Sequence, residues 1–164
     1  MIRIIRNLII LAIVFGIGYL CGNKEVRFYT ITSSGMEPTF ELGDKVIAIK
    51  SDLIKRKDIV LIKHPNNNKE IIIRRIIGLP GEKIKMKKGD VYINNEKLDE
   101  NYIEKDNSSY TKTIPYFSYF VLSDNRKMQD DSSVFGPIEN SLILKKVIVR
   151  YWPIKKFKIF INYQ

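Results

Sequence analysis

The residues best suited to covalent chemistry lie in a short segment near the start of the chain. Two adjacent serines, Ser33 and Ser34, precede Gly35, and Pro38 follows shortly afterwards. A serine hydroxyl becomes a nucleophile when a neighbouring base removes its proton, so such a segment could serve acyl transfer. Taken alone, it is also explained as a loop, because glycine permits a positive φ, proline fixes a turn and serines hydrogen-bond nearby backbone.

Other reactive groups in the chain offer little to complete such a site. His64 is the single histidine and lies among turn-forming residues, so we interpret it as a surface residue without a serine or acid partner. Cys21 is the single cysteine, which excludes an internal disulfide and a pair of thiolate ligands. The sequence shows no convincing set of His, Cys and carboxylate ligands, and we expect no metal and no cofactor.

Four short motifs, in a particular order and spacing, indicate a possible function for the serine segment. They are Met36-Glu37-Pro38-Thr39, Gly43-Asp44-Lys45-Val46, Arg74-Arg75-Ile76-Ile77-Gly78-Leu79-Pro80-Gly81-Glu82, and Asp124-Asn125-Arg126 with Asp131-Ser132. Together they resemble the active-site boxes of type I signal peptidases, across nearly all of the chain that follows the apolar amino-terminal stretch. Those enzymes cut exported preproteins with a serine nucleophile and a neutral lysine base.

The resemblance implies that the groups performing this chemistry are substituted here. It places Gly35 at the nucleophile position and Arg74 at the position of the general-base lysine. Ser33 matches the hydroxyl that helps to hold the oxyanion. Gln129 stands where the family has a serine that orients the base. Three changes in one functional unit predict a scaffold retained without its chemistry, so whether the chain is an enzyme stays open.

The character of Arg74 supports that interpretation. In a strand it shares a face with Ile72 and Ile76, the kind of apolar wall that would keep a lysine neutral. An arginine has a pKa above about 12, so neutralising it near pH 7 would cost at least about 7 kcal/mol. We therefore expect Arg74 to be a permanent cation that is paired with a carboxylate or reaches solvent.

An alternative is an active peptidase with an atypical dyad. Ser34 is the fallback nucleophile, but in an extended loop its side chain would point away from the site. A lysine such as Lys69 or Lys83 would also have to act as the base. The remaining matches to the family are structural, with Asp131 as the expected ion-pair partner of Arg75; they are Met36, Pro38, Thr39, Asp44, Arg75, Asp124, Asn125, Arg126 and Asp131.

The elements that would position these residues are mainly strands. Short runs rich in Ile, Val and Tyr are broken by Gly, Pro and Asn, which favours β structure. We predict strands at residues 45–50, 58–63, 70–77, 116–122 and 143–151, and a small hairpin over 90–98. With the resemblance, the expected fold class is mostly β: an antiparallel signal-peptidase-like domain over residues 26–164, with a small polar insertion of little fixed structure around 94–116.

Residues 1–25 are expected to form a cytoplasmic tip and a single transmembrane anchor. The uncharged stretch 8–21 covers roughly 21 Å, somewhat short of a bilayer core of about 30 Å, but snorkelling and membrane thinning can absorb the difference. A cleaved signal peptide is the alternative, which the absence of a following small-x-small site disfavours. Arg3 and Arg6 predict a cytoplasmic amino terminus and an extracytoplasmic domain on the bacterial cell membrane.

The net charge of +10 favours an anionic partner such as lipid, wall polymer or nucleic acid. The carboxyl-terminal mixture of lysines and aromatics suits either a membrane interface or a sheet edge protected by lysines. We expect membrane lipid and exported preproteins or pilin subunits as partners, and no nucleic acid. The chain is similar to inactive family members that accompany pilin and sortase genes, which implies a non-proteolytic binding or chaperone role.

Overall fold

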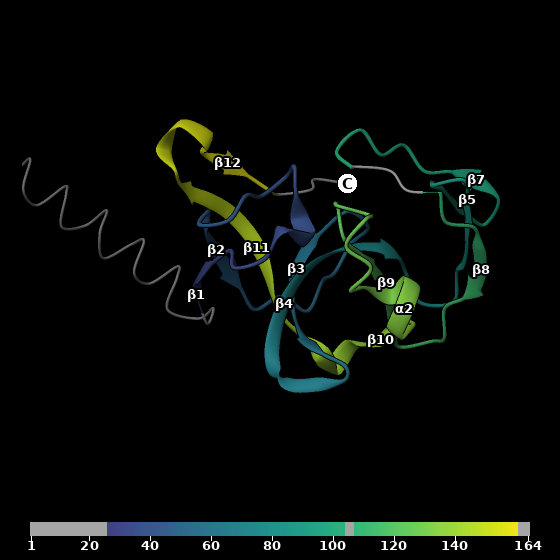
Figure 1. Cartoon of the computed structure of the whole chain (residues 1–164). Helices are drawn as coiled ribbons and strands as arrows, with labels where there is room; N and C mark the ends of the chain where they lie inside the picture. The colour runs from purple at the N-terminus through teal and green to yellow at the C-terminus, as the bar shows by residue number, and fades with distance from the viewer. Residues whose placement is uncertain (1–25, 104–106, 161–164) are drawn as a thin grey trace, which may run out of the picture.

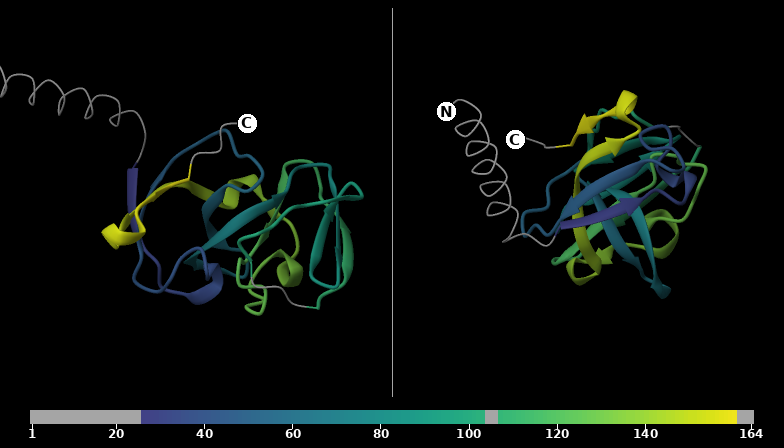
Figure 2. Two further views of the ribbon diagram at one scale, coloured as in Figure 1. Left: turned by 90° about the horizontal axis from the view of Figure 1, so that it is seen from above. Right: turned by 90° about the vertical axis from the view of Figure 1, so that its left-hand side faces the viewer.

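The computed structural model describes residues 26–103 and 107–160, and these form two antiparallel β-sheets. Figure 1 shows the larger sheet on the side where the chain enters β1 and the smaller sheet at the other end, and the view from above in Figure 2 agrees. The predicted antiparallel, mostly β fold is thus confirmed for the described residues. The predicted anchor lies outside them, and no helix within the described ranges is long and apolar enough to cross a membrane.

The larger sheet has eight strands in these residues, with β12 paired beside β11 and off the main order β1-β2-β11-β3-β4-β9-β10. Their bounds are β1 (Val26–Thr30), β2 (Lys45–Ile49), β3 (Ile59–His64), β4 (Asn67–Gly78), β9 (Ser118–Leu122), β10 (Ile138–Glu139), β11 (Ile143–Trp152) and β12 (Lys158–Ile159). The strands predicted from runs rich in Ile, Val and Tyr are therefore present, with ends shifted by a few residues.

The smaller sheet has the order β7-β6-β5-β8. Its strands are β5 (Lys83–Lys87), β6 (Asp90–Ile93), β7 (Glu96–Lys97) and β8 (Tyr110–Thr113). The predicted hairpin is confirmed, since Asn94 and Asn95 form its two-residue turn with positive φ values of 50° and 74°. Within the insertion, the expectation of little fixed structure is wrong at β8, which pairs with β5 as an edge strand of this sheet.

Buried aliphatic side chains hold each layer. One cluster, which includes Phe40, Val46 and Val147, packs beneath β1, β2 and β11. A second cluster joins the sheets, because Ile77 of β4 packs with Ile84 of β5. Within residues 26–103 and 107–160, the helical elements are η1 (Ser34–Met36), α2 (Ser132–Phe135), η2 (Asn140–Leu142) and η3 (Ile154–Lys156). The carboxyl-terminal segment pairs with β11 through β12, while Trp152, Ile154 and Phe157 remain exposed.

Candidate functional site

The serine segment is a buried 3₁₀ turn rather than an extended loop. In η1, Gly35 and Met36 are buried, and the Gly35 carbonyl accepts a hydrogen bond of 3.0 Å from the backbone N–H of Asn125. The first and fourth sequence motifs are therefore tied together by backbone. The extended loop assumed for Ser34 is therefore wrong, and in a 3₁₀ turn the side chains at positions 34 and 35 differ in direction by about a third of a circle. Both Ser34 and Ser33 are half-buried.

The side chain of Arg74 fills the space beside Gly35. A Cβ atom added to Gly35 would lie 3.0 Å from Nη1 and 3.3 Å from Cζ of Arg74. The φ of Gly35 lies outside the left-handed region, so its backbone does not require glycine, contrary to the loop interpretation. The closeness of the guanidinium explains the glycine instead. These two positions, which the resemblance assigns to nucleophile and base, thus lie in direct contact.

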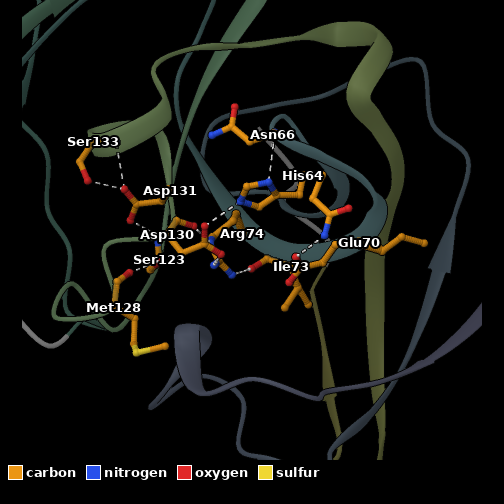
Figure 3. Close-up of polar contacts among 12 residues, drawn as sticks. His64, Asn66, Glu70, Ile73, Arg74, Ser123, Met128, Asp130, Asp131 and Ser133 are labelled. Atoms are coloured by element: carbon orange, nitrogen blue, oxygen red, sulfur yellow. Dashed lines mark hydrogen bonds and ion pairs between the residues drawn. The ribbon is translucent and has the colours of Figure 1, made fainter.

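Arg74 is a buried cation held by Asp130. Its side chain is only 2% exposed, and its Nε and Nη2 donate to the backbone oxygen and to Oδ2 of Asp130 at 2.7 and 2.8 Å. Its Nη1 donates to the carbonyl oxygen of Ile73 at 2.6 Å. Burial lowers the pKa of Arg74, and the charge of Asp130 opposes that effect. The expected carboxylate pairing is confirmed, and Figure 3 shows it.

His64 also belongs to this cluster, so its interpretation as a surface residue without an acid partner is wrong. Its Nε2 lies 2.9 Å from Oδ1 of Asp130, and the side chain is only 14% exposed. Its Nδ1 accepts the backbone N–H of Asn66 at 3.1 Å, and its ring packs edge-on against Phe135. Asp130 therefore bridges the histidine and Arg74 (Figure 3). Both ring nitrogens are engaged, which leaves neither to activate a serine.

Arg75 faces the opposite side of β4 and organises a second buried cluster. Its Nε donates to Oδ1 of Asp124 at 2.8 Å, and its Nη2 donates to Oδ2 of the same carboxylate. Thr39 donates its hydroxyl to Asp124 as well. Although burial alone would lower the pKa of Arg75, the hydrogen bonds and charge of Asp124 outweigh it and raise that pKa. The partner of Arg75 is thus Asp124, and the prediction of Asp131 is wrong.

Asp131 instead anchors the loop that carries Asp130. Its Oδ1 accepts the backbone N–H of Ser133 at 2.9 Å and caps α2, while its Oδ2 accepts the N–H of Ser123 at 2.9 Å. The carboxylate therefore closes the loop between β9 and α2. Gln129, at the expected position of the base-orienting residue, is exposed on this loop.

The other structural residues hold the turn and the loop in place. Met36 is fully buried, whereas Pro38 is exposed. Asp44 accepts hydrogen bonds from the backbone N–H of Glu41 and from Nη1 of Arg150, both at 3.1 Å. Arg126 donates from Nε to the carbonyl of Ser123 at 2.7 Å and from Nη2 to Glu100 at 2.6 Å.

No metal-binding group emerges from this geometry. Within residues 26–103 and 107–160, no three His, Cys, Asp or Glu side chains are grouped so that they could hold an ion. What the site contains is a scaffold of two ionic clusters on opposite faces of β4. Sequence reasoning missed Asp130 and His64, although a buried arginine does require a carboxylate from somewhere in the chain.

Comparison with known proteins identifies the scaffold. The family model described as signal peptidase, peptidase S26, matches residues 1–152. The chain belongs to this signal peptidase family. The predicted resemblance is thus confirmed at the level of the family.

Individual signal peptidases match over most of the chain. Signal peptidase IB of Staphylococcus aureus (strain MRSA252) is 32% identical over 98% of this chain and 95% of its own length. A probable signal peptidase I-2 of Synechocystis is 34% identical over 88% of this chain and 71% of its own. The crystal structure of a signal peptidase I from Enterococcus faecalis matches with a TM-score of 0.52 and 29% identity, covering 59% of this chain and 98% of that one.

Proposed function

We propose that this signal-peptidase-like protein binds exported proteins without cutting them. The observation that carries the proposal is the contact between Gly35 and the buried guanidinium of Arg74. Serine-lysine chemistry needs a hydroxyl at the first position and a removable proton at the second. Gly35 has no side-chain atom that could attack, and a Cβ atom at this position would already lie 3.0 Å from Nη1 of Arg74.

The electrostatics of the pair support the same conclusion. Burial disfavours the charged form of Arg74, but Asp130 contributes a carboxylate oxygen at 2.8 Å that stabilises this charge. At about 1.36 kcal/mol per pKa unit, removing the proton from a guanidinium near pH 7 would cost at least about 7 kcal/mol. Arg74 therefore acts as a structural cation rather than as a base.

A stretch of β4 beside this contact that lacks a paired strand on one side supports peptide binding. Within it, the carbonyl oxygens of Ile71 and Ile73 accept hydrogen bonds from the Tyr29 hydroxyl and from Nη1 of Arg74. On one side, β9 pairs with β4 only at Arg75, Ile76 and Gly78. Within the described residues, no strand covers that side of β4 between residues 67 and 74. An extended peptide can add to such an edge through backbone hydrogen bonds. The unpaired edge therefore ends at Arg74, before the carboxyl end of the strand predicted over residues 70–77.

The clients and the location follow from the resemblance. The carboxyl ends of signal peptides are extended segments, and pilin subunits are exported with such segments, so both are fitting clients. The chain would be held in the bacterial cell membrane by residues 8–21, with residues 26–164 outside. The exposed Trp152, Ile154 and Phe157, with neighbouring lysines, would contact lipid. In this role the protein protects or presents an exported subunit.

The alternative function is cleavage by Ser34. Its half-buried position in η1, one residue before Gly35, is the observation in its favour. It would need a neutral amine as base, yet Lys69 and Lys83 are both exposed and lack the apolar surroundings such a base requires.

A cleavage assay tests the proposal directly. Purified full-length protein in detergent is incubated with a preprotein, and the products are identified by mass spectrometry, with an active signal peptidase as the positive control. We expect no product. A cut after a small-x-small site that Ser34→Ala abolishes would establish the alternative function.

A binding assay tests the positive part of the proposal. A fluorescent peptide with the sequence of a signal-peptide carboxyl end should bind, and Ile71→Glu at the exposed edge of β4 should weaken binding by about tenfold. Leu53→Glu is the matched control, because this residue is also an exposed aliphatic side chain but lies outside the edge. Absence of binding, or equal loss in both variants, would refute binding at this edge.

A further inference from the structure

The smaller sheet exposes a row of lysines on one face. Along β5, Ile84 and Met86 are buried, whereas Lys83, Lys85 and Lys87 are exposed. Because alternate residues of a strand point to the same side, these three ammonium groups extend from one face at intervals of roughly 6.6 Å along the strand.

Neighbouring strands extend this row into a surface. Across the sheet, Lys85 pairs with Tyr92 of β6 and Thr111 of β8, and Tyr92 pairs in turn with Lys97 of β7. Lys85, Lys87, Tyr92 and Asn95 line a shallow hollow of about 200 Å³. We call this surface the cationic face; it consists of Lys83, Lys85, Lys87, Tyr92, Lys97 and Thr111.

The positive charge of the cationic face is only partly compensated. Asp90 lies in register with Lys87, but its carboxylate forms an ion pair with Lys97 at 2.7 Å. Among the residues that the structure describes, no salt bridge joins Lys83, Lys85 or Lys87 to an acid. The three lysines of β5 are therefore available to an anion outside the protein.

The position of the cationic face argues against a lipid bilayer as its occupant. The uncharged stretch 8–21 ends five residues before β1, which belongs to the larger sheet. Figures 1 and 2 show β5, β7 and β8 at the end of the molecule away from β1. A membrane that held residues 8–21 would thus lie at the end of the domain opposite the cationic face.

The composition of the cationic face selects among the remaining polyanions. Cores of protein interfaces are depleted of lysine, so a folded protein partner is a poor match. Proteins that bind single-stranded nucleic acid stack successive bases on aromatic rings, and the cationic face has only Tyr92. Lysine binds phosphate as a point charge, which suits a flexible chain with one charge per short repeat.

We propose that the cationic face docks a linear, non-nucleotide phosphodiester polymer, of the poly(glycerol phosphate) kind. Such a chain would run along β5, with successive phosphates near Lys83, Lys85 and Lys87. This site is separate from the edge of β4, and its function does not depend on the loss of proteolysis. One end of the domain would then face the membrane, and the opposite end would bind an anionic polymer.

Salt-dependent binding tests this proposal. Full-length protein in a non-ionic detergent is titrated against a fluorescent poly(glycerol phosphate) oligomer, and anisotropy is measured between 50 and 200 mM salt, a range of about fourfold. Three phosphate contacts predict a slope of about −2 for log K against log salt, or a loss of roughly 20-fold across this range. The triple variant Lys83→Gln, Lys85→Gln, Lys87→Gln should abolish most of that slope.

The chain provides a matched control with the same change in charge. The triple variant Lys155→Gln, Lys156→Gln, Lys158→Gln removes three lysines at the other end of the domain and should keep nearly all binding. Equal losses in both triple variants would overturn the proposal, as would tighter binding to a DNA oligonucleotide or to polyglutamate of equal charge. If the β5 triple variant has an altered thermal midpoint, Lys85→Gln alone should still reduce the slope by about 0.7.

Discussion

At the scale of single residues, Gly35, Arg74 and Asp130 form one interdependent unit. The glycine makes room for the guanidinium, and the carboxylate compensates its charge. A lysine placed at position 74 would therefore meet Asp130, which stabilises a protonated amine and opposes its use as a base. Under the proposed non-proteolytic function, we therefore expect that gaining cleavage activity needs removal of the carboxylate as well as changes at the two positions that the family resemblance identifies.

This dependence predicts an order of effects for designed variants. Gly35→Ser alone should lower stability by about 1–3 kcal/mol, because its Cβ would lie only 3.0 Å from Nη1 of the buried Arg74 and force it to shift, and should give no cleavage. Adding Arg74→Lys should recover stability but not activity. Adding Asp130→Asn as a third change should produce cleavage of a preprotein, measured by mass spectrometry.

Two outcomes would contradict this account. Cleavage by Gly35→Ser with Arg74→Lys alone would show that Asp130 does not hold the introduced amine in its charged form. An inert triple variant would implicate the substituted positions Gln129 and Ser123, which Gln129→Ser can then test.

Asp130 should also contribute to stability. Asp130→Asn removes the carboxylate that serves both Arg74 and His64, leaving a buried cation with weaker partners. Because Asp130 itself is 43% exposed, we expect a moderate loss of about 1–2 kcal/mol in the free energy of unfolding, measured with urea. Asp52→Asn, at an exposed aspartate, is the control and should change it little. Equal effects would deny Asp130 this role.

The sequence predicted the kind of interaction at Arg74 but not the partner. Its high pKa and apolar neighbours required a carboxylate or solvent, whereas the choice of Asp130 depends on a loop 56 residues away. A separation of 66 residues likewise hid the bond between His64 and Asp130. The assignment of Arg75 to Asp131 failed because Asp131 is engaged in capping α2. Local alternation indicates which face a side chain takes, but it does not determine which distant loop meets that face.

At the scale of elements, β4 joins the two sheets at its carboxyl end. Gly78 packs so closely that an added Cβ would lie 2.1 Å from Cδ1 of Ile114 and 3.0 Å from Cβ of Phe120. All three residues lie where the larger sheet meets the second core cluster. The close approach at Gly78 is therefore a requirement of packing between layers.

A substitution at this junction should be selectively rescued. Gly78→Ala should destabilise the domain by about 1–3 kcal/mol through overpacking, seen as a lower urea midpoint. Ile114→Val removes the Cδ1 atom in question and should by itself cost about 0.5–1.5 kcal/mol. The double variant should lose less unfolding free energy than the two single variants lose together. If the two losses simply add, contact with the Ile114 Cδ1 atom is not the cause of the destabilisation by Gly78→Ala.

Strands with clear apolar runs were predicted well, whereas elements whose formation depends on pairing with distant residues were not. The apolar runs at β3, β4 and β9 indicated their strands directly. In contrast, β8 has the polar sequence Tyr-Thr-Lys-Thr, so only its pairing with β5 reveals it. The turn η1 was also missed, because its carbonyl oxygens accept hydrogen bonds from Asn125, which is distant in the sequence.

At the scale of the whole molecule, the domain has two chemically different ends. Exposed apolar side chains and lysines follow β11, and the cationic face lies on the smaller sheet at the other end. This polarity suits a domain that is held at one surface and reaches toward another.

The proposed orientation can be measured by labelling in cells. Ser141 is exposed, so Ser141→Cys in a Cys21→Ser background provides a single thiol on the domain. If residues 26–164 lie outside the membrane, a membrane-impermeant maleimide should label this thiol in intact cells. Labelling only after lysis would place the domain in the cytoplasm and remove the basis for exported clients.

The packing of Arg74 against Gly35 has a consequence for how this chain can change over generations. Under the proposed non-proteolytic function, a lone mutation that restored a serine would lower stability without producing cleavage, so selection would act against it before a second mutation arose. The proposed function would then be hard to reverse by single substitutions, and other roles of the domain could change independently of proteolysis.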